Sequence, residues 1–316
     1  MFNDFANVWA VVGLAGEFAA GRPHSLQLAG QRVVLFRDQA GVLCALVDRC
    51  PHRGVALSLG TVTDGQIECP FHGWRFDGQG RNCHVPWNPD AKRDTLGATA
   101  LPVREAGGLV WLFTGFAPQD EPQVPDSLLR ADVTLVSQSA EWQVHWTRAM
   151  ENMLDSPHLP FVHKGSIGRG LRDWTGKRMD LQWAPQPWGA TITNQVEGRD
   201  RVNRLDYRFP NAMELFIDPP GRVLHMIALC QPIDDARTQL TIITVRNFAK
   251  SRLLDPLFRW SNRRIAKEDQ AILESSQPAR VPPAGQEKSV RTDAPTLAFR
   301  KIWFERLAGS KALPAS

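Results

Sequence analysis

Two short boxes in the first third of the chain, CPHRG at residues 50–54 and CPFHGW at residues 69–74, constrain its fold more than any other feature. Each box offers one thiol and one imidazole from a loop rich in proline and glycine, and sixteen residues separate His52 from Cys69. A β-hairpin between two such loops would bring them face to face. The boxes therefore predict a metal centre held between two loops of a small β-domain.

The order of the side chains favours an iron–sulfur cluster over zinc. In a Rieske [2Fe–2S] centre two cysteines hold one iron and two histidines hold the other. Cys50 and Cys69 would supply the thiolates, and His52 and His72 the imidazoles. A Cys2His2 zinc site is the alternative, but zinc fingers usually group their two cysteines at one end of the motif and their two histidines at the other.

Composition narrows the class of protein further. The 316 residues suffice for two domains with a substantial core, and 37 basic against 33 acidic residues give a net charge of only +4, which does not support nucleic-acid binding. No apolar run approaches the roughly 18 to 20 residues of a membrane span, so no membrane association is expected. The N-terminal sequence MFNDFANVWA lacks the basic residues of an export signal, and five cysteines are an odd number for a disulfide framework. We therefore expect a cytoplasmic protein.

The first third reads as short strands joined by tight turns. Residues 31–37 and 42–47 are rich in β-forming residues and flank a glycine-containing turn, as in a hairpin. Asp64-Gly65 marks a second hairpin, and residues 109–113 would form a last strand. These patterns predict a small all-β domain over residues 1–116.

The composition changes at residues 117–126, where three prolines and three acidic residues suit an exposed connection between domains. A helix is expected over 143–156, a run of antiparallel strands over 190–246, and a long helix over about 253–276. The chain is thus predicted to be α+β, with a second domain over 117–316 that combines an antiparallel sheet with a long C-terminal helix.

The CPHRG and CPFHGW boxes resemble those of the Rieske non-haem iron oxygenases, and the short second domain is similar to that of their monooxygenase and O-demethylase branch. Respiratory Rieske proteins carry an additional cysteine in each loop, which both loops here lack. The resemblance extends from Trp9 to about Arg300. It implies a Rieske domain followed by a catalytic domain of helix-grip, START-like fold.

The resemblance also implies a second metal. The family carries an aspartate, a histidine three residues later and another histidine five residues after that, and Asp155, His158 and His163 match this pattern. Pro157 and Pro160 disfavour a regular helix here, so a broken turn is expected to aim both imidazoles at one Fe(II). Two imidazoles and one carboxylate on one face of an octahedron leave three positions for O2, water and substrate.

The third ligand must be a carboxylate from elsewhere in the chain. Asp269 aligns with the family's ligand, and helical steps of three and four residues place it on an inward face with Ile265 and Ile272. Glu268 and Glu274 are the local rivals.

Asp155 has a different expected role. It lies one helical turn before His158 and can accept a hydrogen bond from that imidazole, which would fix the tautomer. The resemblance adds that such proteins form homotrimers, in which this aspartate bridges to a Rieske histidine of the neighbouring subunit, here His72. Asn152 matches a family asparagine that supports the same network.

The function implied by the resemblance is that of an oxygenase component. Electrons would come from a separate ferredoxin or flavin reductase, with NAD(P)H acting only through that reductase, and O2 would hydroxylate or oxidatively demethylate a small aromatic or cyclic substrate. A ring cis-dihydroxylating dioxygenase is the first alternative. A non-catalytic Rieske electron-transfer or sensor protein with a ligand-binding domain is the second.

Overall fold

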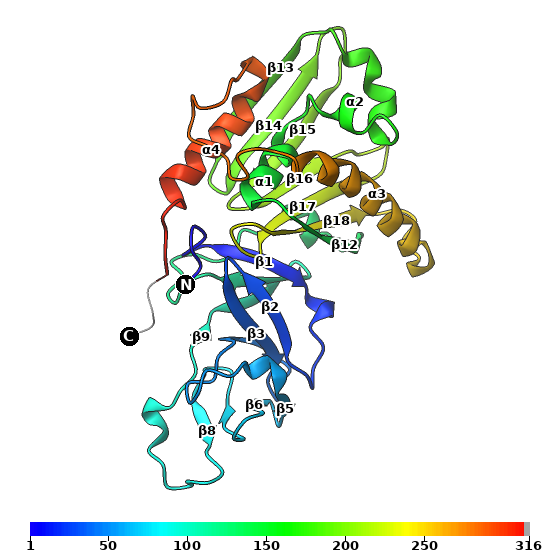
Figure 1. Cartoon of the computed structure of the whole chain (residues 1–316). Helices are drawn as coiled ribbons and strands as arrows, with labels where there is room; N and C mark the ends of the chain where they lie inside the picture. Colours follow the sequence, from blue (N-terminus) through cyan, green and yellow to red (C-terminus); the bar gives the residue numbers. More distant parts are fainter. Residues whose placement is uncertain (313–316) are drawn as a thin grey trace. The chain divides into compact units, whose positions relative to one another are not determined.

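The computed structural model describes residues 1–312 of the chain (Figure 1). These residues form two compact units, Met1–Val124 together with 309–312, and Pro125–Ala308. The expected domain boundary after residue 116 lies at the start of the proline-rich segment, and the division between the two units falls within that segment.

The first unit is built from three small antiparallel sheets, with strand orders β1-β11-β10, β2-β3-β4-β9 and β5-β6-β7-β8. The strands are β1 (Trp9–Leu14), β2 (His24–Leu28), β3 (Gln31–Arg37), β4 (Leu43–Val47), β5 (Thr61–Thr63), β6 (Gln66–Glu68), β7 (Arg75–Phe76), β8 (Asn82–His84), β9 (Ala100–Leu101), β10 (Val103–Ala106) and β11 (Leu109–Phe113). The predicted strands 31–37 and 109–113 are present with these bounds, and the Asp64-Gly65 turn joins β5 to β6.

The two metal-binding boxes lie beside the core of this unit. Apolar side chains of β3, β4, β6 and β7 form one cluster, in which Phe36 and Phe76 are fully buried. The first box follows β4 and the second connects β6 to β7, so strand pairing fixes the place where each loop begins. Cys50 and Cys69 belong to the same buried cluster.

The second unit is organised around one seven-stranded antiparallel sheet in the order β12-β18-β17-β16-β15-β14-β13. The strands are β12 (Thr134–Trp142), β13 (Met179–Gln186), β14 (Gly189–Val196), β15 (Val202–Arg208), β16 (Ala212–Phe216), β17 (Leu224–Pro232) and β18 (Thr238–Arg246). Alternation sets the inner face: in β14, Ala190, Ile192, Asn194 and Val196 are buried while the residues between them are more exposed. The predicted meander is present and is extended by β12 and β13.

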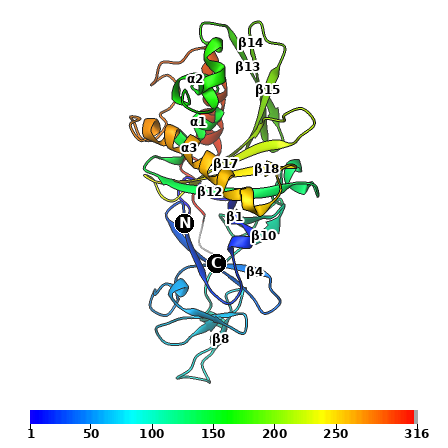
Figure 2. The same ribbon diagram turned by 90° about the vertical axis from the view of Figure 1, so that its right-hand side faces the viewer.

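Helices cover one face of this sheet, as Figure 2 shows for α1, α2 and α3. The helices are α1 (Trp146–Leu154), α2 (Leu159–Val162), α3 (Asp255–Leu273) and α4 (Ala294–Arg306). Helix α3 is the long helix that the sequence predicts, and α4 follows it in a segment where the sequence patterns predicted no helix. Among the described residues, none of the helices has the length and apolar character needed to cross a lipid bilayer.

The chain breaks between α1 and α2 at the predicted place. Asp155 caps the end of α1 in an extended conformation. The helix cannot continue through Pro157, because proline lacks the N–H of a helical hydrogen bond and its ring clashes with the carbonyl four residues earlier. His158 then caps α2, with Pro160 in the first turn, where its missing N–H costs nothing. Asp155 and His158 therefore lie in the connection between α1 and α2 and do not continue either helix.

A buried ion network ties α1, α4 and the loop before α4 together. Arg148 and Glu151 of α1 and Arg300 of α4 are 8%, 9% and 7% exposed. Arg300 contacts both Glu151 and Glu287, and Arg148 donates to Glu287 at 2.6 Å and to the carbonyl of Pro278 at 2.9 Å. The network holds α1, which leads into the predicted iron ligands, against its neighbours.

Replacing Arg300 with methionine should therefore destabilise the second unit. The change keeps much of the side-chain volume but leaves Arg148 as the only cation beside Glu151 and Glu287 in the network. Losing hydrogen bonds to charged groups in this way costs about 1–3 kcal/mol. Urea unfolding followed by circular dichroism measures the effect. Lys301→Met is the matched control, because Lys301 is one residue away and its side chain is 75% exposed. A loss for Arg300→Met no larger than for the control would contradict this role.

Candidate metal centres

The two boxes of the first unit fold into the same loop twice. In the first loop the N–H of Cys50 donates to the carbonyl of Val55 at 2.8 Å, and the N–H of Gly54 donates to the carbonyl of Cys50 at 2.9 Å. The second loop repeats these bonds at 2.8 and 3.0 Å, with Cys69, Trp74 and Gly73 in the equivalent places. The closing glycines have φ of +73° and +69°, the left-handed region that favours glycine. The repetition explains why both boxes need the same residue types.

The loops bring the four predicted cluster ligands together with thiols inside and imidazoles outside. Cys50 and Cys69 are each 2% exposed. The rings of His52 and His72 lie with centroids 4.6 Å apart on the outer rim, and His52 stacks on Trp74 at 4.5 Å. Two sulfur donors on one side and two nitrogen donors on the other fit a [2Fe–2S] cluster of Rieske type.

The thiols also fit a bound metal electrostatically. Burial raises the pKa of Cys50 to about 11, with the backbone N–H of His52 opposing this rise and the neighbouring thiol of Cys69 adding to it. A metal that binds both sulfurs takes them as thiolates and so overcomes the raised pKa. The ligand role of these four residues stays a prediction, and the geometry supports it.

The second unit brings His158, His163 and Asp269 to one point. One ligand atom from each lies within 4.8 Å of the other two. Oδ1 of Asp269 is 3.2 Å from Nε2 of His163 and 3.6 Å from Nε2 of His158. Ligands about 2.1 Å from an octahedral metal and at right angles to each other lie about 3 Å apart, so this spacing suits two imidazoles and one carboxylate on one face of a metal ion.

The carboxylate of Asp269 is incompletely satisfied by the protein. Asp269 is 4% exposed, and its Oδ1 has no hydrogen-bond partner among the described residues. Burial lowers the pKa of His163, but Asp269 and Glu268 outweigh it and raise that pKa above its usual value. A buried acceptor without a donor, beside two imidazole nitrogens, is the arrangement that a bound cation would complete.

Each imidazole is oriented by a carboxylate on its other nitrogen. Nδ1 of His158 lies 3.0 Å from Oδ2 of Asp155, as the sequence predicts, and that oxygen also accepts the backbone N–H of His158 at 3.1 Å. Nδ1 of His163 lies 2.9 Å from Oε2 of Glu268, which accepts the hydroxyl of Ser166 as well. Both contacts leave Nε2 free to face the metal.

The position of Glu268 was not foreseen. The sequence treats it as a rival ligand, whereas the structure places it behind His163. Burial raises the pKa of Glu268, but the hydrogen bonds from Ser166 and His163 outweigh it and hold that pKa below its usual value. Glu274, the other rival, accepts bonds from the backbone of Gln143 and from Gln270 and lies outside the ligand group.

Glu268→Ala should weaken iron binding without abolishing it. Loss of a carboxylate that orients a metal-bound histidine typically costs 10- to 100-fold in affinity. Glu268→Gln keeps an acceptor for the His163 proton and should recover most of that loss. Iron dissociation constants measured by competition with a chelator test both variants. If Glu268→Ala loses as much iron affinity as Asp269→Ala, Glu268 is a ligand and not a positioning residue.

The helix face predicted for α3 is only partly right. Ile265 and Asp269 are buried at 8% and 4% exposure, but Ile272 is 55% exposed. Asp269 is therefore the last buried residue of α3, and Ile272 faces solvent. Asn152, the predicted support residue, lies in the cavity wall, and its buried Nδ2 has no hydrogen-bond partner within residues 1–312.

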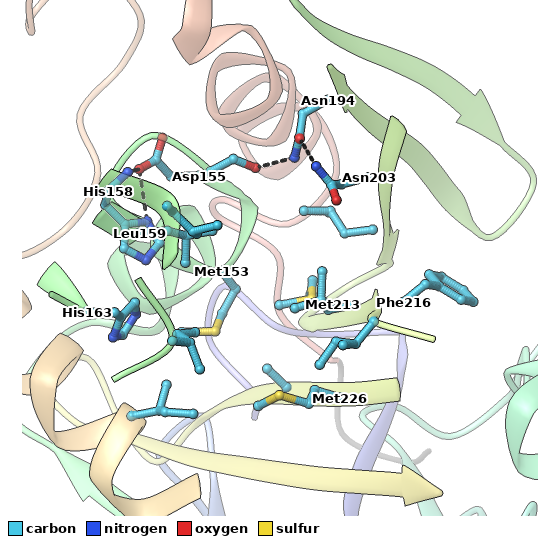
Figure 3. A pocket seen from close by; sticks show the side chains of 18 of the residues that line it. Met153, Asp155, His158, Leu159, His163, Asn194, Asn203, Met213, Phe216 and Met226 are labelled. Atoms are coloured by element: carbon cyan, nitrogen blue, oxygen red, sulfur yellow. Dashed lines mark hydrogen bonds and ion pairs between the residues drawn. The ribbon is translucent and has the colours of Figure 1, made fainter. Parts of the chain in front are cut away.

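A cavity of about 500 Å³ adjoins the three convergent side chains (Figure 3). Its wall is largely apolar and includes Met153 of α1, Met213 of β16 and Met226 of β17. Helical segment η5 (Ile167–Trp174) contributes Ile167, Leu171 and Trp174 to the same wall. A mostly apolar cavity with few polar groups is the usual form of a small-molecule site.

The cavity contains polar residues that sequence reasoning missed. Asn194 and Asn203 face each other across β14 and β15, and Nδ2 of Asn203 donates to Oδ1 of Asn194 at 2.9 Å. Nδ2 of Asn194 in turn donates to the hydroxyl of Ser156 at 2.9 Å. Asn194 occupies a position of β14 that alternation places on the buried face. This signal could be recognised only once the bounds and register of the strand were known.

Comparison with known proteins places both units in families. Residues 8–100 match the model of the Rieske [2Fe-2S] domain, and residues 185–308 match that of the vanillate O-demethylase oxygenase C-terminal domain. The first match contains all four predicted cluster ligands, and the second contains Asp269 but begins after His163.

Curated relatives are identical to the chain at between 25% and 34% of the aligned residues. The chain is 34% identical over 185 residues to 4beta-methylsterol monooxygenase of Methylococcus capsulatus, covering 53% of this chain and 48% of the relative. It is 31% identical over 163 residues to the oxygenase component of dicamba O-demethylase of Stenotrophomonas maltophilia, covering 51% and 48%. The alignments span 28% to 51% of the lengths of the curated relatives.

Solved structures show the same fold. Dicamba monooxygenase bound to dicamba superposes with a TM-score of 0.79 at 22% identity, covering 95% of this chain and 96% of the other. A variant of NdmA of Pseudomonas putida with theobromine gives a TM-score of 0.81 at 22% identity, covering 95% and 90%. With a Rieske [2Fe-2S] domain joined to a vanillate O-demethylase oxygenase C-terminal domain, the chain belongs to the Rieske non-haem iron oxygenase family.

Proposed function

We propose that this protein is the oxygenase component of a Rieske-type system that hydroxylates or oxidatively demethylates a small aromatic or cyclic molecule. The observation that carries the proposal is the meeting of Nε2 of His158, Nε2 of His163 and Oδ1 of Asp269 beside an apolar cavity. When bound, a [2Fe–2S] cluster supplies single electrons and a mononuclear iron supplies an open ferrous site for O2.

The protein's own residues would hold and orient these groups. Cys50, Cys69, His52 and His72 would hold the cluster, and Asp155 and Glu268 would keep the two histidines of the iron site in the tautomer that exposes Nε2. Asn152 lies in the same wall as Asp155 and would support it. The apolar wall excludes water from the reacting part of the substrate.

The chemistry of the relatives supports this reaction class. Dicamba O-demethylase removes a methyl group, and 4beta-methylsterol monooxygenase acts on a methylsterol, as their names state. Because two relatives are named as oxygenase components, a separate ferredoxin or flavin reductase would supply the electrons to this chain. A 3-chlorobenzoate-3,4-dioxygenase subunit among the relatives keeps ring dihydroxylation as the alternative reaction.

Assembly and location extend the proposal. A homotrimer would place His72 of one subunit beside Asp155 of the next, and both side chains are partly exposed. Only Oδ2 of Asp155 is engaged by the described residues, so Oδ1 is available for such a contact. A cytoplasmic location stays a prediction from the N-terminal sequence.

The iron content of the purified protein tests the proposal. We expect about three irons per chain, two in the cluster and one at the mononuclear site. Elemental analysis against protein concentration measures the total, and the visible absorption of the cluster measures the first two. A total of two that does not rise after anaerobic reconstitution with Fe(II) would favour the electron-transfer or sensor alternative.

A further inference from the structure

The polar side chains in the cavity wall define what it can bind. Asn194 is 7% exposed and Ser156 is 3% exposed, and they continue a hydrogen-bonded chain that begins at Asn203. Each Nδ2 in this chain donates toward Ser156, so the end of the chain at Asn203 carries an amide oxygen. None of the described residues donates to that oxygen. Figure 3 shows it on the side of the amide away from Asn194.

The charges of the wall disfavour an anionic ligand. Arg199 and Arg201 line the cavity, but both are exposed. Arg199 is paired with Asp173, and Arg201 donates to the carbonyl of Ile217 at 2.6 Å. An acceptor oxygen at Asn203 repels a carboxylate and attracts a hydroxyl or N–H group. Among the described lining residues, no unengaged buried cation offsets this preference. The unpartnered Nδ2 of Asn152 is a donor in the same wall, but it carries no charge.

The size of the cavity argues for more than one ring. An apolar cavity of about 150 Å³ holds benzene, and this one is about 500 Å³. A single-ring molecule would leave most of the apolar wall without contacts. The complex would then lose dispersion attraction and the free energy gained by burying apolar surface. The three methionines of the wall can adapt to the outline of a larger ring system.

We propose that the cavity takes a neutral, multi-ring molecule with one hydroxyl or N–H group, which donates to Oδ1 of Asn203. In Figure 3, Asn203 lies on the opposite side of the cavity from His163. The donor group therefore lies at the end of the molecule away from the position that reacts. The statement about which end of the molecule reacts rests on the proposed function. The statement about what the cavity binds does not.

Binding of matched three-ring probes to the full-length, iron-loaded protein tests the proposal. Equilibrium dialysis at pH 7, without reductase, compares 9-phenanthrol, phenanthrene, phenanthrene-9-carboxylate and 9-fluorenone. We expect 9-phenanthrol to bind about tenfold more tightly than phenanthrene, the gain from one well-placed hydrogen bond. The carboxylate should bind more weakly than phenanthrene. Phenol should bind at least tenfold more weakly than 9-phenanthrol, because it buries less apolar area.

A substitution assigns the preference to one residue. Asn203→Leu should bind phenanthrene at least as well as the wild type and lose the roughly tenfold preference for 9-phenanthrol. Val202→Leu is the control, because Val202 is the adjacent residue and is 51% exposed. Retained preference in Asn203→Leu overturns the proposal.

If Asn203→Leu fails to fold and binds no probe, the affinities of the wild-type protein for the probes test the proposal on their own. Tighter binding of phenanthrene-9-carboxylate or of phenol than of 9-phenanthrol overturns the proposed ligand class. Tighter binding of 9-fluorenone than of 9-phenanthrol overturns the assignment of an acceptor at Asn203. Because no turnover is measured, the proposed oxygenase reaction can fail while this binding result stands, and the reverse also holds.

Discussion

Asp269→Ala is expected to empty the mononuclear iron site and abolish turnover, while the cluster of the first unit stays intact. The variant leaves two imidazoles and no anionic ligand, so a ferrous ion loses both a bond and its charge partner. We expect iron affinity to fall by more than about 100-fold, beyond the 10- to 100-fold cost of losing a group that only orients a ligand. Iron analysis should give about two irons per chain instead of three.

The controls for Asp269→Ala come from the same helix. Glu274→Ala removes an acid five residues away that bonds to Gln143 and Gln270, and it should keep three irons and normal turnover. The visible spectrum of the cluster should be unchanged in both variants, because its four ligands lie in the other compact unit. An Asp269→Ala protein that retains the third iron would show that this carboxylate is not a ligand.

Asp155→Asn is expected to keep both metal centres and lose turnover by about 10- to 100-fold. An asparagine carbonyl can still accept the Nδ1 proton of His158, so most of the iron should remain. The variant lacks the negative charge and the free Oδ1 that would bridge to His72 of the neighbouring subunit. Electron delivery to the iron site should therefore be slowed more than iron binding is weakened.

A single-turnover experiment separates bridging from simple orientation. The cluster is reduced chemically, and its reoxidation is followed at visible wavelengths after mixing with O2 and substrate. Slow reoxidation with iron affinity close to wild type indicates a broken bridge. Asp200→Asn, an exposed acid in the loop after β14, serves as the control. Wild-type turnover in Asp155→Asn would remove Asp155 from the electron path.

Short sequence patterns predicted the ligand loops of this chain, because the residues that form each loop lie within a few positions of one another. Each box of the first unit needs a thiol, an imidazole and a closing glycine within five or six residues, and backbone bonds inside the loop enforce the geometry. The same is true of the broken turn at Pro157 and Pro160, which aims His158 and His163 at one point. Such features are readable because the atoms that interact are close in the sequence.

Partners that are distant in the sequence could not be read in this way. Glu268 lies 105 residues after His163, and the sequence could only treat it as a rival of its neighbour Asp269. On a helix these two adjacent residues differ by about 100° in direction. The packing of α3 beside α2 decides that one faces the metal position and the other reaches the far nitrogen of the imidazole.

By itself, the sequence determined the two ligand loops, the broken turn and several of the strands and helices, because each depends on a few consecutive residues. Only the tertiary structure decided that Glu268 lies behind His163, that Asn194 and Asn203 meet inside an apolar cavity, and that a further helix packs in the second unit. These outcomes depend on strand register and helix packing, which sum many weak contacts between segments far apart in the chain.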